Sequence, residues 1–263
     1  SEMCIRDSLI IGFGDLAERL ESYLLQKDNS IFGLTRSPEK YKGSNLLYWD
    51  WNLGTEFELS VRNFDAVIFF PKPSEYDESG YEAGFINSLE LIEKSLKKIE
   101  YKSFIGISST RVYGSNQYGE LSEVNTPEPS DFRGSIVLNY ENLVKSKFGA
   151  KSLILRLTGL YDNQTNWIAN FVTNFDGQKR NLPNIVTNRL HRDTCAEIIA
   201  FALKHDLYLN DDLINCSEGP ISYEDLFKEI HANKNFSDYF DCENKNARVV
   251  SNSKLKELGF QFK

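Results

Sequence analysis

The chain has 263 residues, of which 41% are hydrophobic and 26% are charged, a composition typical of a globular protein with a large core. Its formal net charge is −8, from 30 basic and 38 acidic residues, and it contains no basic run. This balance excludes nucleic acid as an expected partner, and apolar stretches no longer than a strand exclude an expected membrane span.

The cysteines and histidines are few, with 4 cysteines and 3 histidines scattered along the chain. They form neither a Cys-x-x-Cys pair nor the close His and Cys spacing of a metal site. We therefore expect reduced thiols, no bound metal and a cytoplasmic location.

The first residues do not resemble the start of a buried strand. Residues 1–8 are mostly polar, whereas an apolar run begins at Leu9. A DNA sequence that encodes residues 1–8 resembles a transposase adapter used in sequencing libraries, so we expect this segment to be an adapter-derived artefact. The alternative is a genuine polar N-terminus.

Short apolar runs then alternate with helical patterns. The expected strands are residues 9–11, 30–34, 46–49, 66–70, 104–107, 153–157 and 213–215. The expected helices are one that carries Leu16, Leu20 and Leu24 on a single stripe, followed by residues 81–98, 138–148 and 195–204. This alternation predicts βαβ units and a parallel sheet. Residues 113–133 and 162–189 are expected to be loops that build the site.

The first strand leads into a glycine turn. Gly12-Phe13-Gly14-Asp15-Leu16-Ala17 has the pattern G-x-G-x-x-A between a strand and a helix. The first glycine permits a tight turn, the second allows the backbone to approach a pyrophosphate, and the small Ala17 allows close packing of helix on strand. The helix N-terminus adds amide donors. We expect these residues to bind a dinucleotide; the alternative is a turn without a ligand.

The end of the second strand indicates which dinucleotide is bound. A site for NAD places an acidic residue here to bind the ribose hydroxyls, whereas this chain has Thr35, Arg36 and Ser37. Arg36 can pair with a 2′-phosphate and the two hydroxyls can donate to it, so the sequence favours NADP over NAD. Asp50 and Pro71, after the third and fourth strands, are further expected cofactor contacts. Asp50 could equally be a turn residue, and the alternative for Arg36 is a solvated surface arginine.

Five motifs occur in a characteristic order along the chain. They are the glycine turn, ISSTRVYG (107–114), LRLTGLY (155–161), RLHRD (189–193), and LINCS (213–217) followed by ISYEDL (221–226). In this order they resemble the extended or atypical short-chain dehydrogenase/reductase family, of the NAD-dependent epimerase/dehydratase type. The resemblance covers nearly everything after residue 8.

The resemblance implies a proton-transfer site that this chain retains only in part. In the family a serine or threonine of S-S-x-x-V-Y-G hydrogen-bonds the reacting oxygen, and the matching residue here is Ser109. A Tyr-x-x-x-Lys pair then acts as acid and base, with a glutamate after three further residues. Anchored on Glu141, the pair falls on Arg133 and Val137, and neither has the required chemistry.

Other residues of the motifs are candidates for the remaining roles. Tyr113 is a candidate proton donor, or alternatively packs within its turn, and Arg133 is a candidate to polarise a carbonyl, although arginine is a poor acid or base. The expected substrate contacts are Ser108, Thr110, Tyr161 and His191, with His191 alternatively a structural hydrogen-bonding residue. Asp193 or Thr194 is expected to cap the helix that follows.

We therefore predict a Rossmann-type doubly wound parallel α/β sheet in residues 9–158 and a small C-terminal substrate-covering region in residues 159–263, partly interleaved with the core. The predicted function is an NADP-dependent oxidoreductase or epimerase/dehydratase-like protein that acts on a small hydroxyl- or carbonyl-bearing metabolite or a nucleotide sugar. The alternative is a non-catalytic NADP-binding sensor or scaffold. A small-molecule substrate is the expected partner, and a monomer or homodimer is the expected assembly.

Overall fold

The computed structural model describes residues 7–24, 30–43, 45–179, 185–240 and 247–263. Residues 1–6 of the expected adapter segment lie outside these ranges, and Ser8 begins the first strand. Within these ranges, none of the helices combines the length and the hydrophobicity that crossing a membrane requires.

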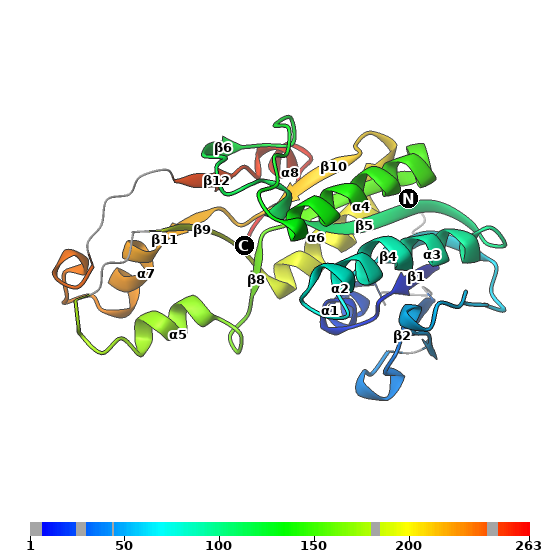
Figure 1. The fold of residues 1–263 in the computed structure, drawn as a ribbon, viewed down its shortest axis with the longest axis horizontal. Helices are drawn as coiled ribbons and strands as arrows, with labels where there is room; N and C mark the ends of the chain where they lie inside the picture. The colour runs from blue at the N-terminus through cyan, green and yellow to red at the C-terminus, as the bar shows by residue number, and fades with distance from the viewer. Residues whose placement is uncertain (1–6, 25–29, 44, 180–184, 241–246) are drawn as a thin grey trace.

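A sheet of seven parallel strands forms the centre of the molecule (Figure 1). Its strands are β1 (Ser8–Ile11), β2 (Ile31–Thr35), β3 (Asn45–Tyr48), β4 (Asn63–Phe69), β5 (Glu100–Ser109), β7 (Ser152–Leu157) and β10 (Leu213–Cys216). Across the sheet they follow the order β10-β7-β5-β4-β1-β2-β3, which reverses direction at β1 as in a Rossmann-type fold. The predicted fold class and the seven predicted strands are confirmed.

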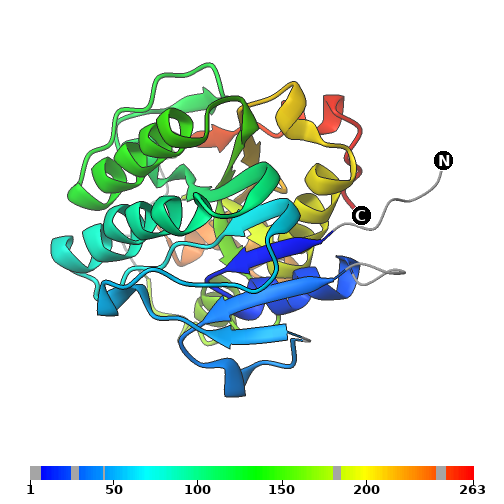
Figure 2. The same cartoon turned by 90° about the vertical axis from the view of Figure 1, so that its right-hand side faces the viewer.

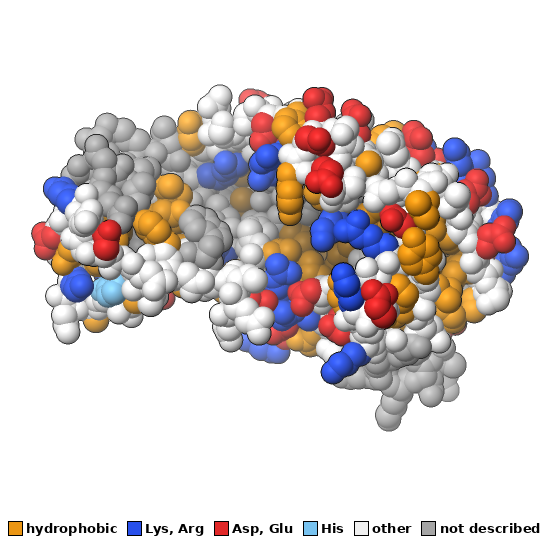
Figure 3. Space-filling view, turned by 60° about the horizontal axis from the view of Figure 1, so that its bottom comes forward, with side chains coloured by type: hydrophobic (Ala, Val, Ile, Leu, Met, Phe, Trp, Pro, Cys, Tyr) orange, Lys and Arg blue, Asp and Glu red, His pale blue; other side chains and the backbone are white. Residues whose placement is uncertain are grey.

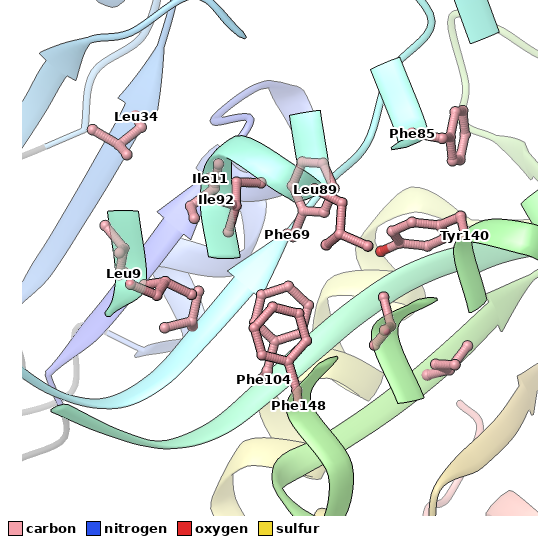
Figure 4. Close-up of a cluster of buried hydrophobic side chains, with 14 of the residues drawn as sticks. Leu9, Ile11, Leu34, Phe69, Phe85, Leu89, Ile92, Phe104, Tyr140 and Phe148 are labelled. Atoms are coloured by element: carbon pink, nitrogen blue, oxygen red, sulfur yellow. The ribbon is translucent and has the colours of Figure 1, made fainter. Parts of the chain in front are cut away.

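Helices cover both faces of the sheet (Figure 2). On one face α1 (Asp15–Leu24) packs against α6 (Arg192–Lys204), and their buried side chains join Ile10 and Ile68 of the strands. The other face is covered by α2 (Glu78–Glu82), the π-helical turn η3 (Ala83–Asn87), α3 (Ser88–Leu96) and α4 (Phe132–Phe148). Figure 4 shows the core on this face, where the rings of Phe104 and Phe148 stack 3.8 Å apart.

The helices start earlier than the apolar patterns predicted, because polar caps precede each apolar stripe. Asp131 accepts a hydrogen bond from the Gly134 amide at 2.7 Å, so α4 begins at Phe132 rather than at residue 138. Asp77 caps α2 in the same way. Short 3-10 turns also occur along the described chain: η1 (Pro38–Lys40), η2 (Trp51–Leu53), η4 (Thr110–Val112), η5 (Gly149–Lys151), η6 (Leu207–Leu209) and η7 (Phe236–Asp238).

Smaller elements lie beyond the carboxyl ends of the main strands. β8 (Gly159–Tyr161), β9 (Val186–His191) and β11 (Pro220–Ser222) form a three-stranded sheet, and β6 (Gly119–Leu121) pairs in parallel with β12 (Arg248–Val250). α5 (Trp167–Thr173) and α7 (Tyr223–Ile230) share a separate apolar cluster, and α8 (Ser253–Glu257) packs near β10. The two expected loops are therefore corrected: residues 113–133 contain β6, and residues 162–189 contain α5 and the start of β9.

A buried ion pair connects the sheet to α4. The side chains of Arg156, on β7, and Glu141, on α4, are 3% and 2% exposed. Arg156 donates to both carboxylate oxygens of Glu141, at 2.9 and 2.7 Å, and Ser108 donates to the same carboxylate at 2.6 Å. Arg156 also donates to the Tyr113 hydroxyl at 3.0 Å. Every charge in this cluster is compensated, which a buried charge requires.

We predict that Arg156→Met destabilises the fold by about 3–5 kcal/mol, because it leaves the Glu141 carboxylate buried without its partner. The free energy of unfolding in urea measures this change. Lys98→Met is the matched control, because it breaks an exposed ion pair with Glu58 and should cost less than about 1 kcal/mol. Equal losses in the two variants would contradict the prediction.

Candidate functional site

A cavity of about 1110 Å³ opens at the carboxyl ends of the main strands. The loops after β1, β2, β3, β4, β5 and β7 line it, together with residues of β9 and β12. Figure 3 shows this hollow with apolar side chains on its floor and Lys and Arg side chains gathered around it. In doubly wound sheets the ligand site lies in this position, beside the point where the strand order reverses.

The glycine turn, which the sequence predicts to bind a dinucleotide, forms one wall of the cavity. Gly12 has a φ of 80°, and a Cβ there would collide with the carbonyl oxygen of Phe70. A Cβ on Gly14, by contrast, would have nothing nearer than the Tyr41 hydroxyl at 3.8 Å. Gly12 is therefore required by the fold, whereas Gly14 keeps a space open above the backbone that a ligand can fill.

The other residues of the turn divide between lining and packing. Phe13 lines the cavity, but its ring is buried at 2% exposure against Tyr41, with centroids 5.9 Å apart. Asp15, Leu16 and Ala17 line the cavity at the first turn of α1, and Ala17 is also buried where α1 meets the sheet. The start of α1 thus directs backbone amides at the space above Gly14.

The end of β2 adds polar and basic groups to the same cavity. Thr35, Arg36 and Ser37 all line it, and the Ser37 amide donates to the Thr35 hydroxyl at 3.3 Å. Arg36 is exposed and makes no side-chain hydrogen bond or ion pair with any described residue, and the same holds for Lys40. Both cations are therefore available to an anionic ligand.

Two further expected cofactor contacts, Asp50 and Pro71, also line the cavity. Asp50 has a structural task as well, because its carboxylate accepts a hydrogen bond from the Asn52 amide at 3.0 Å and so caps the turn η2.

The turn after β5 presents hydroxyl groups to the cavity. Ser109 and Thr110 line it, and the Ser109 hydroxyl oxygen accepts from the Arg111 amide at 3.2 Å. This arrangement leaves the Ser109 hydroxyl hydrogen available to a ligand oxygen. Ser108 also borders the cavity but is 5% exposed, and it donates to Glu141 in the buried cluster. Ser108 is better described as a support of this turn than as a substrate contact.

Of the two candidates for catalysis, Tyr113 borders the cavity and Arg133 does not. The Tyr113 hydroxyl donates to the Ser122 carbonyl at 2.9 Å and accepts hydrogen bonds from Arg156 and from Asn215 Nδ2. Tyr113 therefore supports its own turn, which is the packing alternative that the sequence left open.

Arg133 is absent from the described lining of the cavity, and its guanidinium lies over the ring of Phe132 at 5.4 Å. Val137, at the expected lysine position, is 1% exposed.

Tyr161 and His191 likewise lie outside the described lining of the cavity. The Tyr161 hydroxyl donates to Glu218 at 2.8 Å, and burial together with this carboxylate raises the pKa of Tyr161 to about 12. His191 Nδ1 accepts from the Asp193 amide at 3.1 Å and so caps α6, the role predicted for Asp193 or Thr194. The structural alternative for His191 therefore fits its position.

Sequence reasoning missed an ion cluster at the edge of the cavity. Arg19 pairs with Asp15, Asp162 and Asp193 at 3.1, 3.0 and 2.7 Å, and Arg192 pairs with Asp15 at 3.1 Å. The cluster ties the start of α1 to the start of α6 and to the loop after β8. The only signal in the sequence was the four-residue spacing of Asp15 and Arg19, typical of an ion pair on a helix.

Hydrogen bonds hold Asp162 in its charged form. The amide and hydroxyl of Thr165 donate to its carboxylate at 2.7 and 2.8 Å, and the Gln164 amide donates at 2.9 Å. These donors, with Arg192, lower the pKa of Asp162 to about 2.

Sequence reasoning also missed most of the charged lining. The basic residues are Arg36, Lys40, Lys72, Arg111, Arg192 and Arg248, and the acidic residues are Asp15, Asp50 and Asp131. The cavity is thus locally basic in a chain of net charge −8, so its electrostatic field favours an anionic ligand.

No family model and no curated protein matches the chain, but solved structures share its fold. A protein assigned to the NAD-dependent epimerase/dehydratases from Methylobacillus flagellatus aligns with a TM-score of 0.75 and 22% identity, over 98% of this chain and 93% of that one. The UDP-glucuronic acid 4-epimerase of Bacillus cereus, in complex with NAD, aligns with a TM-score of 0.73 and 16% identity, over 95% and 91%.

A short-chain dehydrogenase/reductase superfamily protein from Agrobacterium tumefaciens, with bound NAD, gives a TM-score of 0.72 and 14% identity, over 98% of this chain and 92% of that one. The resemblance in fold that the sequence motifs indicated is therefore confirmed over nearly the whole chain.

We predict that Asp162→Asn lowers the melting temperature at neutral pH and flattens its pH dependence in acid. The pKa of Asp162 falls from 3.8 to about 2 on folding, so its stabilisation is present above about pH 4 and is lost as the pH falls towards about 2. Melting temperatures of parent and variant between pH 2 and pH 7 measure this. Glu90→Gln, at an exposed position of α3, is the control and should leave the slope unchanged.

Proposed function

We propose that this chain is an NADP-binding member of the short-chain dehydrogenase/reductase family, and that it acts as an oxidoreductase or epimerase on a small hydroxyl- or carbonyl-bearing metabolite or nucleotide sugar. The observation that carries the proposal is the open space above Gly14 at the start of α1. The solved structures of similar fold that contain NAD support a nicotinamide dinucleotide in this position.

The choice of NADP rests on the end of β2. Arg36 and Lys40 line the cavity there without a carboxylate partner among the described residues, and no acidic residue stands at the strand end to bind ribose hydroxyls. A guanidinium can bind a 2′-phosphate through charge-assisted hydrogen bonds. The similar structures contain NAD, but that is a property of those proteins. A direct comparison of NADP and NAD binding therefore decides which cofactor this chain prefers.

The cavity contains residues that could bind the cofactor and orient a substrate for hydride transfer, but among the described residues it lacks the family's acid–base pair. Bound NADP would supply the hydride acceptor or donor. The amides at the start of α1 would bind its pyrophosphate, and Ser109 would orient the oxygen of the substrate by donating its hydroxyl hydrogen. With Arg133 and Val137 at the family's Tyr and Lys positions, general acid–base help worth about 10²- to 10⁴-fold is missing, so we expect slow turnover of simple alcohols and ketones.

A non-catalytic NADP sensor is the second candidate function. The observations that favour it are the loss of the Tyr-x-x-x-Lys pair and the engagement of the Tyr113 and Tyr161 hydroxyls in other hydrogen bonds. Against it stands the Ser109 hydroxyl at the cavity, because a sensor has no need to orient a reacting oxygen. The Thr110 hydroxyl, by contrast, donates to the Leu157 carbonyl at 3.3 Å.

We predict that the protein binds NADPH about ten- to a hundredfold more tightly than NADH, and that Arg36→Ala removes most of this preference. Calorimetric titration with each cofactor measures both affinities. Gly14→Val is the comparison variant: a Cβ at this position meets nothing nearer than the Tyr41 hydroxyl at 3.8 Å, so the side chain should occupy the space of the ligand, abolish binding of both cofactors and largely keep the melting temperature. Equal affinities of the parent for NADPH and NADH would overturn the NADP assignment.

We predict that Ser109→Ala slows turnover about a hundredfold and leaves NADPH affinity unchanged, because it removes one donor to the reacting oxygen. A panel of carbonyl compounds and nucleotide sugars, followed by NADPH absorbance, provides the assay. Ser146→Ala on the outer side of α4 is the control. Fast turnover that Ser109→Ala does not change would exclude this mechanism, whereas tight NADPH binding with no turnover of any compound would favour the sensor.

A further inference from the structure

A tyrosine hydroxyl without a protein partner lies above the glycine turn. Tyr41 lines the cavity, and its hydroxyl oxygen is 3.8 Å from the position that a Cβ on Gly14 would take. This hydroxyl makes no hydrogen bond with any of the described residues. The second tyrosine in the described lining, Tyr113, donates to the Ser122 carbonyl at 2.9 Å. Of the two, Tyr41 therefore keeps its donor hydrogen for a ligand.

The connection between β2 and β3 holds the Tyr41 hydroxyl in place. The ring of Tyr41 packs edge-on against the buried ring of Phe13, at an interplanar angle of 66°. The Tyr41 amide donates to the Pro38 carbonyl and so closes the turn η1. The next amide, that of Lys42, donates to the Glu18 carboxylate on α1 at 3.0 Å. Because the connection is attached to the glycine turn and to α1, the hydroxyl is positioned before any ligand binds.

The packing of the Tyr41 ring does not explain its hydroxyl, because a phenylalanine would make the same contact with Phe13. The hydroxyl lies instead at the space above Gly14, to which the backbone amides at the start of α1 also supply donors. The carboxylate at this helix start, Asp15, is compensated by Arg19 and Arg192, each at 3.1 Å. The space therefore favours an anion that accepts several hydrogen bonds.

We propose that Tyr41 is a further binding residue for the dinucleotide and that its hydroxyl donates to the diphosphate rather than to the 2′-phosphate. This inference rests on the proposed function, because it concerns the cofactor of the same site. The hydroxyl lies at Gly14, where a diphosphate approaches the backbone, whereas Arg36 lies at the end of β2. Since NADH and NADPH share the diphosphate, Tyr41 contributes equally to both affinities, and Arg36 contributes to that of NADPH alone.

The first test removes the hydroxyl and keeps the ring. Tyr41→Phe is titrated by calorimetry with NADPH, NADH and ADP, which carries a diphosphate but neither nicotinamide nor a 2′-phosphate. We expect all three affinities to fall by the same factor, about tenfold, through loss of one charge-assisted hydrogen bond. The melting temperature without ligand should stay at the parental value, because the contact with Phe13 is kept.

Tyr48→Phe is the matched control. Tyr48 is a tyrosine of the same part of the chain, on β3, but it is 61% exposed and lies outside the described lining of the cavity. This variant should bind all three ligands as the parent does. Parental affinities in Tyr41→Phe would overturn the inference, and so would a loss confined to NADPH, which would place the hydroxyl at the 2′-phosphate. If Tyr41→Phe fails to fold, Tyr41→Leu replaces it, because leucine also packs on Phe13 without a hydroxyl.

The second test asks whether Tyr41 and Arg36 bind different phosphates. Groups that act on separate parts of a ligand have additive effects on its binding free energy. We therefore expect Tyr41→Phe to lower NADPH affinity by the same factor in the parent and in Arg36→Ala. An effect of Tyr41→Phe that disappears in Arg36→Ala would mean that both residues serve the 2′-phosphate, and would overturn the assignment to the diphosphate.

The titration with ADP separates this inference from the proposed function. If the parent binds ADP but neither dinucleotide, and Tyr41→Phe weakens ADP binding about tenfold, the cofactor proposal fails and the diphosphate site at Tyr41 stands. If the parent binds NADPH and Tyr41→Phe binds it equally well, the cofactor proposal stands and the role of Tyr41 fails. Absence of binding of all three ligands by the parent would overturn both.

Discussion

The ion pair between Glu141 and Arg156 is the interaction on which the site depends. Both charges are buried, so each must keep its partner, and the geometry of the pair fixes the distance between α4 and β7. Ser108 donates to Glu141, and Tyr113 accepts from Arg156, so the same pair holds the turn that carries Ser109 from both ends. The wall of the cavity at Ser109 is therefore supported by this buried polar cluster. Apolar side chains pack on both faces of the sheet around it.

Local patterns in the sequence were sufficient for the main sheet and for the glycine turn. A parallel strand buried on both faces is a near-continuous apolar run, and β1, β4 and β7 are recognisable because most of their residues are apolar. The small sheets were not recognisable, because β6 and β12 have three residues each and pair across more than a hundred positions of the chain. Their stability comes from tertiary contacts, which no short window of sequence contains.

The candidate site divides in the same way. Cofactor-side residues such as Gly14 and Arg36 sit within a few positions of a strand end, and the parallel topology brings such ends together. Side-chain direction could not be predicted: Tyr113, a candidate for catalysis, and Tyr161, an expected substrate contact, are near the site in the chain, but their hydroxyls donate to Ser122 and Glu218. Arg156 had a visible signal, since it is the one charged residue in the buried strand SLILRL. Arg248 had none, because only the pairing of β12 brings it to the cavity.

Because β10 lies at the edge of the sheet and is late in the sequence, it determines which surfaces remain uncovered while the chain is being translated. β10 is the neighbour of β7, and on its other side it pairs with no strand of the described residues. The preceding helix α6 covers α1. While a ribosome is still making the segment after β8, β7 presents an unpaired edge and the apolar face of α1 lacks its cover. Such edges invite pairing with other chains. Between translation of β7 and of β10 the nascent chain therefore exposes both a strand edge and an apolar helix face that the finished fold covers.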